Sequence, residues 1–211
     1  MNLSFFALVN IVLAIFTVQI LDGCTKTEVP VPTQTATSTA TSTDVHTLPI
    51  RKSIHPWAYD DFVATHVTDA MLAANAGALC PNYSKVDHKA FWVAMVRATA
   101  YYESGYHVDQ DYTESFPDTN GNKQISSGLL QLSLDDSKNY PTPSCKKMNT
   151  TAIIHTAEPN LACGIEIMDY RIKKYPGQAI GPKPVLGSYW STIRDAKILP
   201  MLKADIPECF Q

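Results

Sequence analysis

A segment with helical periodicity at residues 87–103 constrains the fold more than any other part of this 211-residue chain. Its apolar positions recur at the spacing of one buried helix face. They form two adjacent stripes: Trp92, Val96, Thr99 and Glu103 on one, and Phe91, Met95, Ala98 and Tyr102 on the other. Gly105 follows, and glycine is common just after the last turn of a helix. The pattern predicts a central helix that ends with a carboxylate, Glu103, on its apolar side.

Helical periodicity recurs along the rest of the chain, whereas strand-like alternation is rare. We expect further helices at residues 60–74, 129–137, 160–175 and 189–202. Residues 107–124 are rich in turn formers and have no apolar period, so they are expected to form a loop that holds at most one small hairpin. The predicted fold class is therefore mainly α, with an α+β character if the hairpin forms.

The first 24 residues are read as an export signal. An apolar run at residues 5–21 is short for a membrane span and typical of a signal-peptide core. Leu21-Asp22-Gly23-Cys24 resembles a lipobox, in which Cys24 would carry the lipid, although Asp22 and the lack of a preceding cation depart from that pattern. We expect export, either as a periplasmic or outer-membrane lipoprotein or in secreted form, with a retained anchor as a third possibility.

Composition divides the remainder into a tether and a folded domain. Residues 25–49 are rich in Thr, Ser and Pro and are read as a linker, because such a segment buries too little apolar surface to offset its ordering entropy. Residues 50–211 then form one domain of ordinary size. The formal net charge is −3 and no basic patch is evident, so no nucleic-acid partner is expected.

Four cysteines remain once Cys24 is set aside, an even number that fits an oxidising compartment. Three pairings are possible. We favour Cys145 with Cys163, which joins a loop to a helix start, and Cys80 with Cys209, which ties down the C-terminus. Four buried thiols are the alternative. A zinc site is disfavoured because the sequence has no CxxC spacing, and no metal or other cofactor is expected.

Two short motifs resemble the ES…GLMQ signature of the superfamily of lysozyme-like lytic transglycosylases and goose-type lysozymes. The first is Glu103-Ser104-Gly105, and the second is Ser127-Gly128-Leu129-Leu130-Gln131. The resemblance implies a lysozyme-like fold and peptidoglycan as substrate. It also implies that Glu103 is the catalytic acid, that Gly128 permits close backbone approach and that Gln131 lines the cleft beside Ser127. Ser104 is expected to hold the loop by bonding to the backbone.

The physical reading of Glu103 agrees with that role. A glycosidase acid must protonate a poor leaving group near neutral pH, and burial raises a carboxyl pKa by desolvation. The structural alternative is a local cap or ion pair. A negative charge at a helix C-terminus is unfavourable against the helix dipole, so the position gives no structural advantage.

The resemblance extends downstream but is incomplete. Asn160 to Gly164 looks like the N-x-x-x-G helix start of these enzymes, with Gly164 allowing close packing. The superfamily's third signature, Ala-Tyr-Asn, is absent. Tyr189 and Trp190 stand nearest to its place, and either ring would suit stacking on a sugar. They are equally well explained as core aromatics.

The segment after Glu103 is acidic: Asp109, Asp111, Glu114 and Asp118 occur before the next Lys or Arg, which is Lys123. Three interpretations stay open. It is a solvated loop, a calcium loop that begins at Asp118 but lacks the required Gly and Glu, or a wall of the cleft. As a wall, it would position a water or favour the ammonium of de-N-acetylated glucosamine. In this respect the domain resembles lysozymes of predatory bacteria that prefer deacetylated peptidoglycan.

The sequence thus predicts a muramidase that cleaves the β-1,4 bond between N-acetylmuramic acid and glucosamine, acetylated or not. One alternative is a lytic transglycosylase that leaves a 1,6-anhydro product. The other is a catalytically inactive wall-binding lipoprotein. We expect a monomer whose partner is peptidoglycan, held at a membrane if Cys24 is lipidated.

Overall fold

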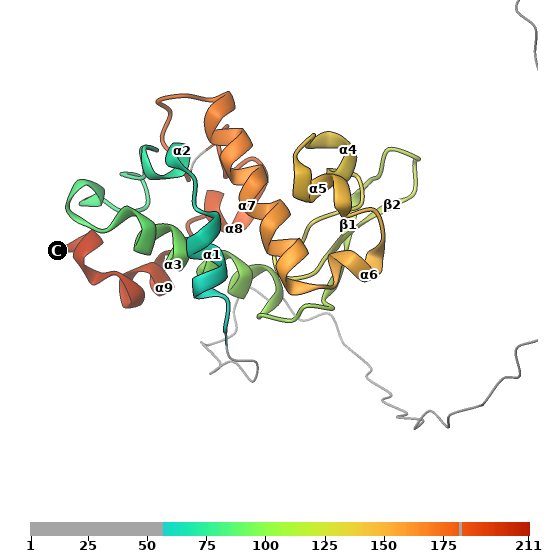
Figure 1. Ribbon diagram of the computed structural model, residues 1–211, viewed down its shortest axis with the longest axis horizontal. Coiled ribbons are helices and arrows are strands. Elements are labelled where there is room, and N and C mark those ends of the chain that lie inside the picture. Colours follow the sequence, from blue (N-terminus) through green and yellow to red (C-terminus); the bar gives the residue numbers. More distant parts are fainter. Residues whose placement is uncertain (1–56, 182) are drawn as a thin grey trace, which may run out of the picture. The chain divides into compact units, whose positions relative to one another are not determined.

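The computed structural model describes residues 57–181 and 183–211, and the expected signal segment, Cys24 and the linker lie outside them. Helices dominate the described part, with one antiparallel hairpin (Figure 1). The elements are α1 Asp60–His66, α2 Asp69–Leu72, η2 Tyr83–Lys85, α3 His88–Ser104, β1 Asp111–Pro117, β2 Lys123–Ser127, α4 Asp136–Asn139, α5 Pro143–Lys147, α6 Thr151–Ile154, α7 Ala157–Lys174, α8 Ser191–Arg194, α9 Leu199–Asp205 and η3 Pro207–Phe210. The predicted mainly-α class with a small hairpin is confirmed. No helix in the described ranges is long and apolar enough to cross a membrane.

Helix α3 is the predicted central helix, and its ends are defined by local chemistry. The Asp87 carboxylate accepts hydrogen bonds from the backbone N–H groups of Lys89, at 2.8 Å, and Ala90, at 3.2 Å, which satisfies two free donors of the first turn. At the other end Gly105 takes a left-handed conformation with φ +61°, and its N–H bonds to the Tyr101 carbonyl. This stop places Glu103 in the last turn.

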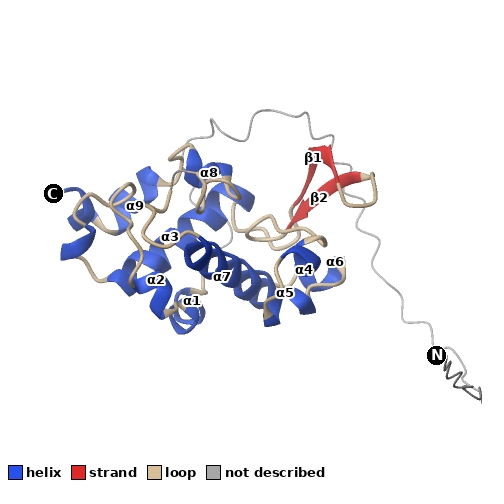
Figure 2. Cartoon of the chain, turned by 90° about the horizontal axis from the view of Figure 1, so that it is seen from above, coloured by secondary structure: helices blue, strands red, loops and turns tan. Residues whose placement is uncertain are grey.

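The second long helix, α7, packs against α1, α2, α5 and α6. Gly164 makes its contact with the loop after the hairpin possible, because a Cβ at that position would lie 2.3 Å from Leu130 Cδ1. The close packing expected of Gly164 is therefore present, and its partner is Leu130. In both views the hairpin and α9 lie at opposite ends of the described domain (Figures 1 and 2).

Three expected helices differ from the structure. The segment 60–74 is broken at Val67, which is extended, so that Thr68 can cap α2. The segment 189–202 is broken into α8 and α9 around Ala196, which has φ +56°. The segment 129–137 begins as a turn, with Gln131 at φ +50°, and only α4 at its end is helical. Most of the periodic apolar residues are at least partly buried, with Leu134 among the exceptions, so periodicity reported burial better than backbone continuity.

Both favoured disulfide pairings are present. Cys145 in α5 bonds to Cys163 in α7, and Cys80 bonds to Cys209 in η3. All four sulfurs belong to fully buried residues. These two bonds fit an exported protein.

Candidate active site

Glu103 lies in the last turn of α3, is partly buried, and accepts a hydrogen bond from the Thr192 hydroxyl at 2.5 Å. Burial raises the pKa of its carboxyl to about 7. The Thr192 hydroxyl and the Lys197 ammonium oppose that rise, while the negative charge of Glu114 adds to it. A carboxyl with such a pKa is partly protonated at neutral pH and can donate a proton.

Glu114 is the second carboxylate near this acid. It lies in the middle of β1, the one residue of that strand that is not fully exposed. The Ser126 hydroxyl on β2 donates a 2.6 Å hydrogen bond to its Oε1. In one of the three interpretations of the acidic segment, a wall of the cleft, the segment would contribute a carboxylate. Glu114 is the residue of this segment whose charge acts on Glu103.

The segment around α8 contributes groups that the sequence reading missed. Thr192 is buried and binds Glu103 through its hydroxyl, while its carbonyl accepts the N–H of Lys197 at 2.9 Å. Ala196 between them has φ +56°, a conformation that a non-glycine residue adopts at a cost. No motif marked these residues in the sequence. Their only signal was their position shortly after Tyr189, the tyrosine nearest to the place of the missing third signature.

The turn that carries the second motif is bound to the end of α3. The Ser104 hydroxyl donates to the carbonyls of Ala100, at 2.9 Å, and Leu129, at 3.1 Å. The expected loop-holding role of Ser104 is therefore present, although its buried side chain is not placed to contact a substrate. Ser127 is also buried, and its N–H and carbonyl pair with Leu132.

Gly128 and Asn160 explain why this turn is so closely packed. Gly128 has φ +75°, and a Cβ there would lie 2.4 Å from Asn160 Nδ2 and 2.6 Å from the Ile154 carbonyl. The buried Asn160 amide donates to the carbonyls of Ser127 and Ile154 and accepts the Leu130 N–H. Close backbone approach at Gly128, expected from the resemblance, is thus confirmed.

Gln131 is used within the same loop. Its Nε2 donates to the carbonyls of Gly128, at 2.9 Å, and Gln110, at 3.0 Å. These bonds join the turn to the residue that precedes β1. Part of the Gln131 side chain stays accessible, so its expected place in the cleft is compatible with the structure.

Tyr189 and Trp190 have different surroundings. Trp190 is 2 % exposed, and its indole N–H donates to the Leu130 carbonyl at 3.0 Å, so the alternative reading as a core aromatic describes it and sugar stacking does not. Tyr189 is partly accessible and donates a 2.5 Å hydrogen bond to the buried Asp136 carboxylate. Burial raises the pKa of Tyr189, and the nearby charges of Asp136 and Glu103 add to the rise. Tyr189 therefore borders the acid, but its hydroxyl is engaged by Asp136.

The remaining acidic residues are dispersed and do not form a single cluster. Asp109 is exposed between α3 and β1. Asp111 begins β1 and pairs with His155 Nε2 at 2.8 Å. Partial burial opposes its ionisation, but hydrogen bonds from Ser127 and His155 outweigh burial and lower the pKa of Asp111. Asp111 therefore has a partner in His155, although the acidic segment itself contains no Lys or Arg before Lys123.

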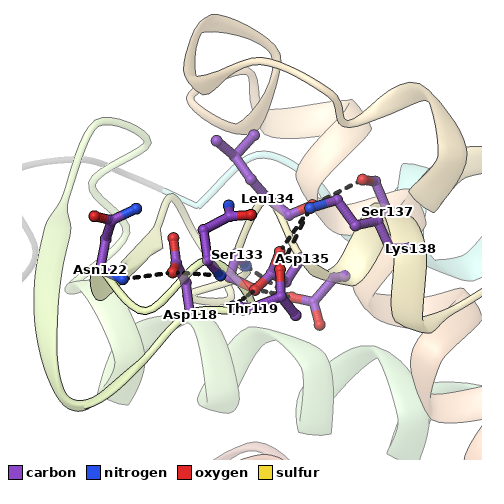
Figure 3. Close-up of polar contacts among 10 residues, drawn as sticks. Asp118, Thr119, Asn122, Ser133, Leu134, Asp135, Ser137 and Lys138 are labelled. Atoms are coloured by element: carbon purple, nitrogen blue, oxygen red, sulfur yellow. Dashed lines mark hydrogen bonds and ion pairs between the residues drawn. The ribbon is translucent and has the colours of Figure 1, made fainter.

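Asp118 belongs to the hairpin turn. Its Oδ1 accepts the N–H groups of Asn120 and Asn122, both at 2.8 Å. The adjacent Thr119 donates its N–H and hydroxyl to Asp135, beside α4, at 2.9 and 2.8 Å (Figure 3). Within the described ranges no group of three or more His, Cys, Asp or Glu residues is placed to hold a metal ion. Asp118 Oδ1 thus closes a turn, which accounts for the calcium-like spacing.

Comparison with solved structures finds the same fold in DslA (Bd0314), a Bdellovibrio protein. A Glu-to-Gln mutant of DslA matches with a TM-score of 0.59 and 24% identity over 69% of this chain and 87% of that chain. The wild-type form matches with a TM-score of 0.58 and 24% identity, over the same shares of the two chains. A second Glu-to-Gln mutant matches with a TM-score of 0.55 and 25% identity over 70% and 91%.

No family model matches the chain, and no curated protein matches it. The DslA comparison therefore establishes similarity at the level of the fold.

Proposed function

We propose that this protein is a peptidoglycan glycosidase that cleaves the β-1,4 bond between N-acetylmuramic acid and glucosamine, with Glu103 as general acid. The observation that carries the proposal is the environment of Glu103: a partly buried carboxyl with a pKa raised to about 7, beside a second carboxylate on a different element. Protonation of the glycosidic oxygen by Glu103 would let the leaving sugar depart as a neutral alcohol.

Glu114 is the best candidate for the second catalytic carboxylate. As the anion, it would remove a proton from water attacking the anomeric carbon, or stabilise the positive charge that develops on the ring. The DslA mutants support this assignment, because the two glutamates replaced there are eleven positions apart, as Glu103 and Glu114 are here. The pairing favours hydrolysis over anhydro-ring formation, which needs no second carboxylate.

The same charges support a preference for one acetylation state of the substrate. De-N-acetylated glucosamine carries an ammonium, and the acidic segment offers the partly buried Glu114 carboxylate and the exposed Asp109 carboxylate. A cationic sugar would be attracted there, and the attraction would weaken with salt because these groups are in contact with solvent. We therefore extend the proposal to a preference for deacetylated peptidoglycan.

We further propose that the protein is exported. Export fits the two disulfides, and lipidation at Cys24 would attach the domain to a membrane near its substrate through the linker. We propose that the domain acts as a monomer. A catalytically inactive wall-binding lipoprotein is the rival, and the raised pKa of Glu103 argues against it.

The test is digestion of purified sacculi, fully acetylated or enzymatically deacetylated, followed by mass spectrometry of the released fragments. Reducing muropeptides, released faster from deacetylated walls, are expected. Anhydro products would instead indicate a lytic transglycosylase. No release beyond that of the Glu103→Gln variant on either wall would support the binding protein and reject the enzyme.

A further inference from the structure

The hairpin exposes apolar side chains that a protein normally buries. The exposed large hydrophobic residues of the described chain are Tyr112 at 60%, Phe116 at 52%, Ile125 at 43% and Leu134 at 44%. Three of them lie on β1 and β2, and the fourth lies shortly after the hairpin. Scattered exposed apolar residues need no explanation, but their concentration in one small element indicates an interaction surface.

Tyr112 lies on the same face of the hairpin as Glu114. Tyr112 is directly opposite Ser126 in the strand register, and the Ser126 hydroxyl bonds to Glu114. Phe116 lies past an irregularity in the strand pairing, and it lines one surface hollow together with Glu114, Ser115, Asn122 and Lys123. Ile125 is opposite Thr113, one position along the strand, and so belongs to the other face.

The hairpin that carries these rings is held at both ends. At its base Asp111 pairs with His155, and the Gly128 N–H bonds to the Gln110 carbonyl at 2.9 Å. At its tip Thr119 donates two hydrogen bonds to Asp135, which Lys138 also contacts (Figure 3). The exposed rings are thus presented on an element fixed by contacts elsewhere, which lowers the entropy lost on binding.

We propose that Tyr112 and Phe116 form a platform on which sugar rings of the glycan strand stack, next to the bond that Glu103 breaks. The proposal rests on the proposed function and specifies how that site holds its polymer. A pyranose has an apolar C–H face that an aromatic ring can cover, and hydroxyl edges that suit the surrounding Glu114, Asn122 and Lys123. Tyr112 shares a strand face with Glu114, and Phe116 shares a surface hollow with it, so continuity with the proposed catalytic carboxylate favours a glycan over a second copy of the protein.

The first test measures binding without cleavage. Glu103→Gln protein is co-sedimented with insoluble sacculi, alone and with Tyr112→Ala, Phe116→Ala or both. Each ring removed is expected to weaken binding on the order of three- to tenfold. Tyr112→Phe and Phe116→Tyr, which keep the rings, should bind as the parent does. Ile125→Ala is the matched control, since it removes an exposed apolar side chain from the opposite face.

Unchanged binding by the double alanine variant would overturn the platform, and so would an equal loss in Ile125→Ala. Loss of binding in Tyr112→Phe would also overturn stacking, because the ring is retained. Concentration-dependent dimerisation that the alanine variants abolish would assign the surface to a second copy instead. Circular dichroism and the melting temperature of each variant establish that the fold is kept.

The second test separates this proposal from the catalytic one. In the otherwise wild-type enzyme, the alanine variants should raise KM for long glycan strands three- to tenfold, with kcat changed less than twofold and little effect on the shortest cleavable oligosaccharide. Equal effects on long and short substrates would reject the platform. Cleavage that survives Glu103→Gln would reject the proposed function, whatever the binding result.

Discussion

The Thr192 hydroxyl donates a 2.5 Å hydrogen bond to the Glu103 carboxylate across 89 positions of sequence. The bond joins the last turn of α3 to α8 and stabilises the ionised form of the acid. Burial acts in the opposite direction and prevails, since the pKa of Glu103 is still raised to about 7. The protonation state of the acid is therefore a balance between desolvation and a hydrogen bond that can be altered separately.

Replacement of Glu103 by Gln should abolish wall cleavage. The amide keeps the size of the side chain and can accept the Thr192 hydrogen bond, but it has no proton to donate. General acid catalysis contributes roughly two to four decades, so clearance of sacculi should fall by that amount. Turbidity of a wall suspension measures it. More than about a tenth of wild-type activity would show that another residue is the acid.

The same substitution should stabilise the protein above neutral pH. Because the folded-state pKa of Glu103, about 7, lies above its ordinary value of 4.5, the folded state binds the proton more tightly than the unfolded state. The resulting stability is complete below about pH 4.5 and is lost as pH rises to about 7. Glu103→Gln has no carboxyl to ionise and avoids that loss. Its free energy of unfolding relative to the wild type should therefore increase over this pH range, by about 1–3 kcal/mol. Melting temperatures at pH 4 and pH 8 test this, and equal differences at both would contradict it.

Removal of the Thr192 hydroxyl should shift the pH profile upward. The hydroxyl lowers the pKa of Glu103, so Thr192→Val should raise that pKa. Because the acid must be protonated, the alkaline limb of kcat/KM, expected near pH 7, should move to higher pH. Thr192→Ser keeps the donor and serves as the control. A limb that shifts equally in both variants would assign the effect to packing rather than to the hydrogen bond.

Gly128 should tolerate no side chain, and Gly177 provides a matched comparison. Both have φ +75°, so alanine meets the same backbone strain at each, roughly 1–2 kcal/mol. At Gly128 the new Cβ also collides with Asn160 and Ile154, whereas nothing lies within 4 Å at Gly177. Gly128→Ala should thus lose about 1–3 kcal/mol more than Gly177→Ala in denaturant unfolding. Equal losses would mean that the turn can move aside.

The two disulfides should contribute unequally to stability. Cys80 and Cys209 are separated by 129 positions, and Cys145 and Cys163 by 18. In the chain-entropy model, removing the longer closure costs about 5 kcal/mol and the shorter about 3 kcal/mol. Paired Cys→Ser variants, unfolded in denaturant, measure the difference.

Thiol titration of the denatured, unreduced domain should read near zero, and four reactive thiols would reject both bonds.

The two long helices were predictable because their signals are local. The α3 pattern, with Asp87 before it and Gly105 after it, marks its ends within one residue. Helix α7 is predicted by the same kind of periodicity. The short elements were not, because Leu129, Leu130 and Leu132 are buried in a turn rather than in a helix. The Leu130 N–H bonds to Asn160, and the Leu130 side chain packs against Gly164. A burial pattern does not reveal which backbone conformation achieves the burial.

The candidate site likewise has features that local sequence predicts and features that depend on the tertiary structure. The sequence by itself determined the central helix and the placement of Glu103 at its apolar end, since both follow from neighbouring residues. Only the tertiary structure decided which carboxylate of the acidic segment lies in electrostatic range of Glu103. Strand pairing directs Glu114 toward Ser126, and Asp111 is engaged by His155. It also decided that Thr192 binds the acid and that Trp190 is in the core. These relationships join residues far apart in the chain, and they depend on how the helices and the hairpin pack, which no local pattern specifies.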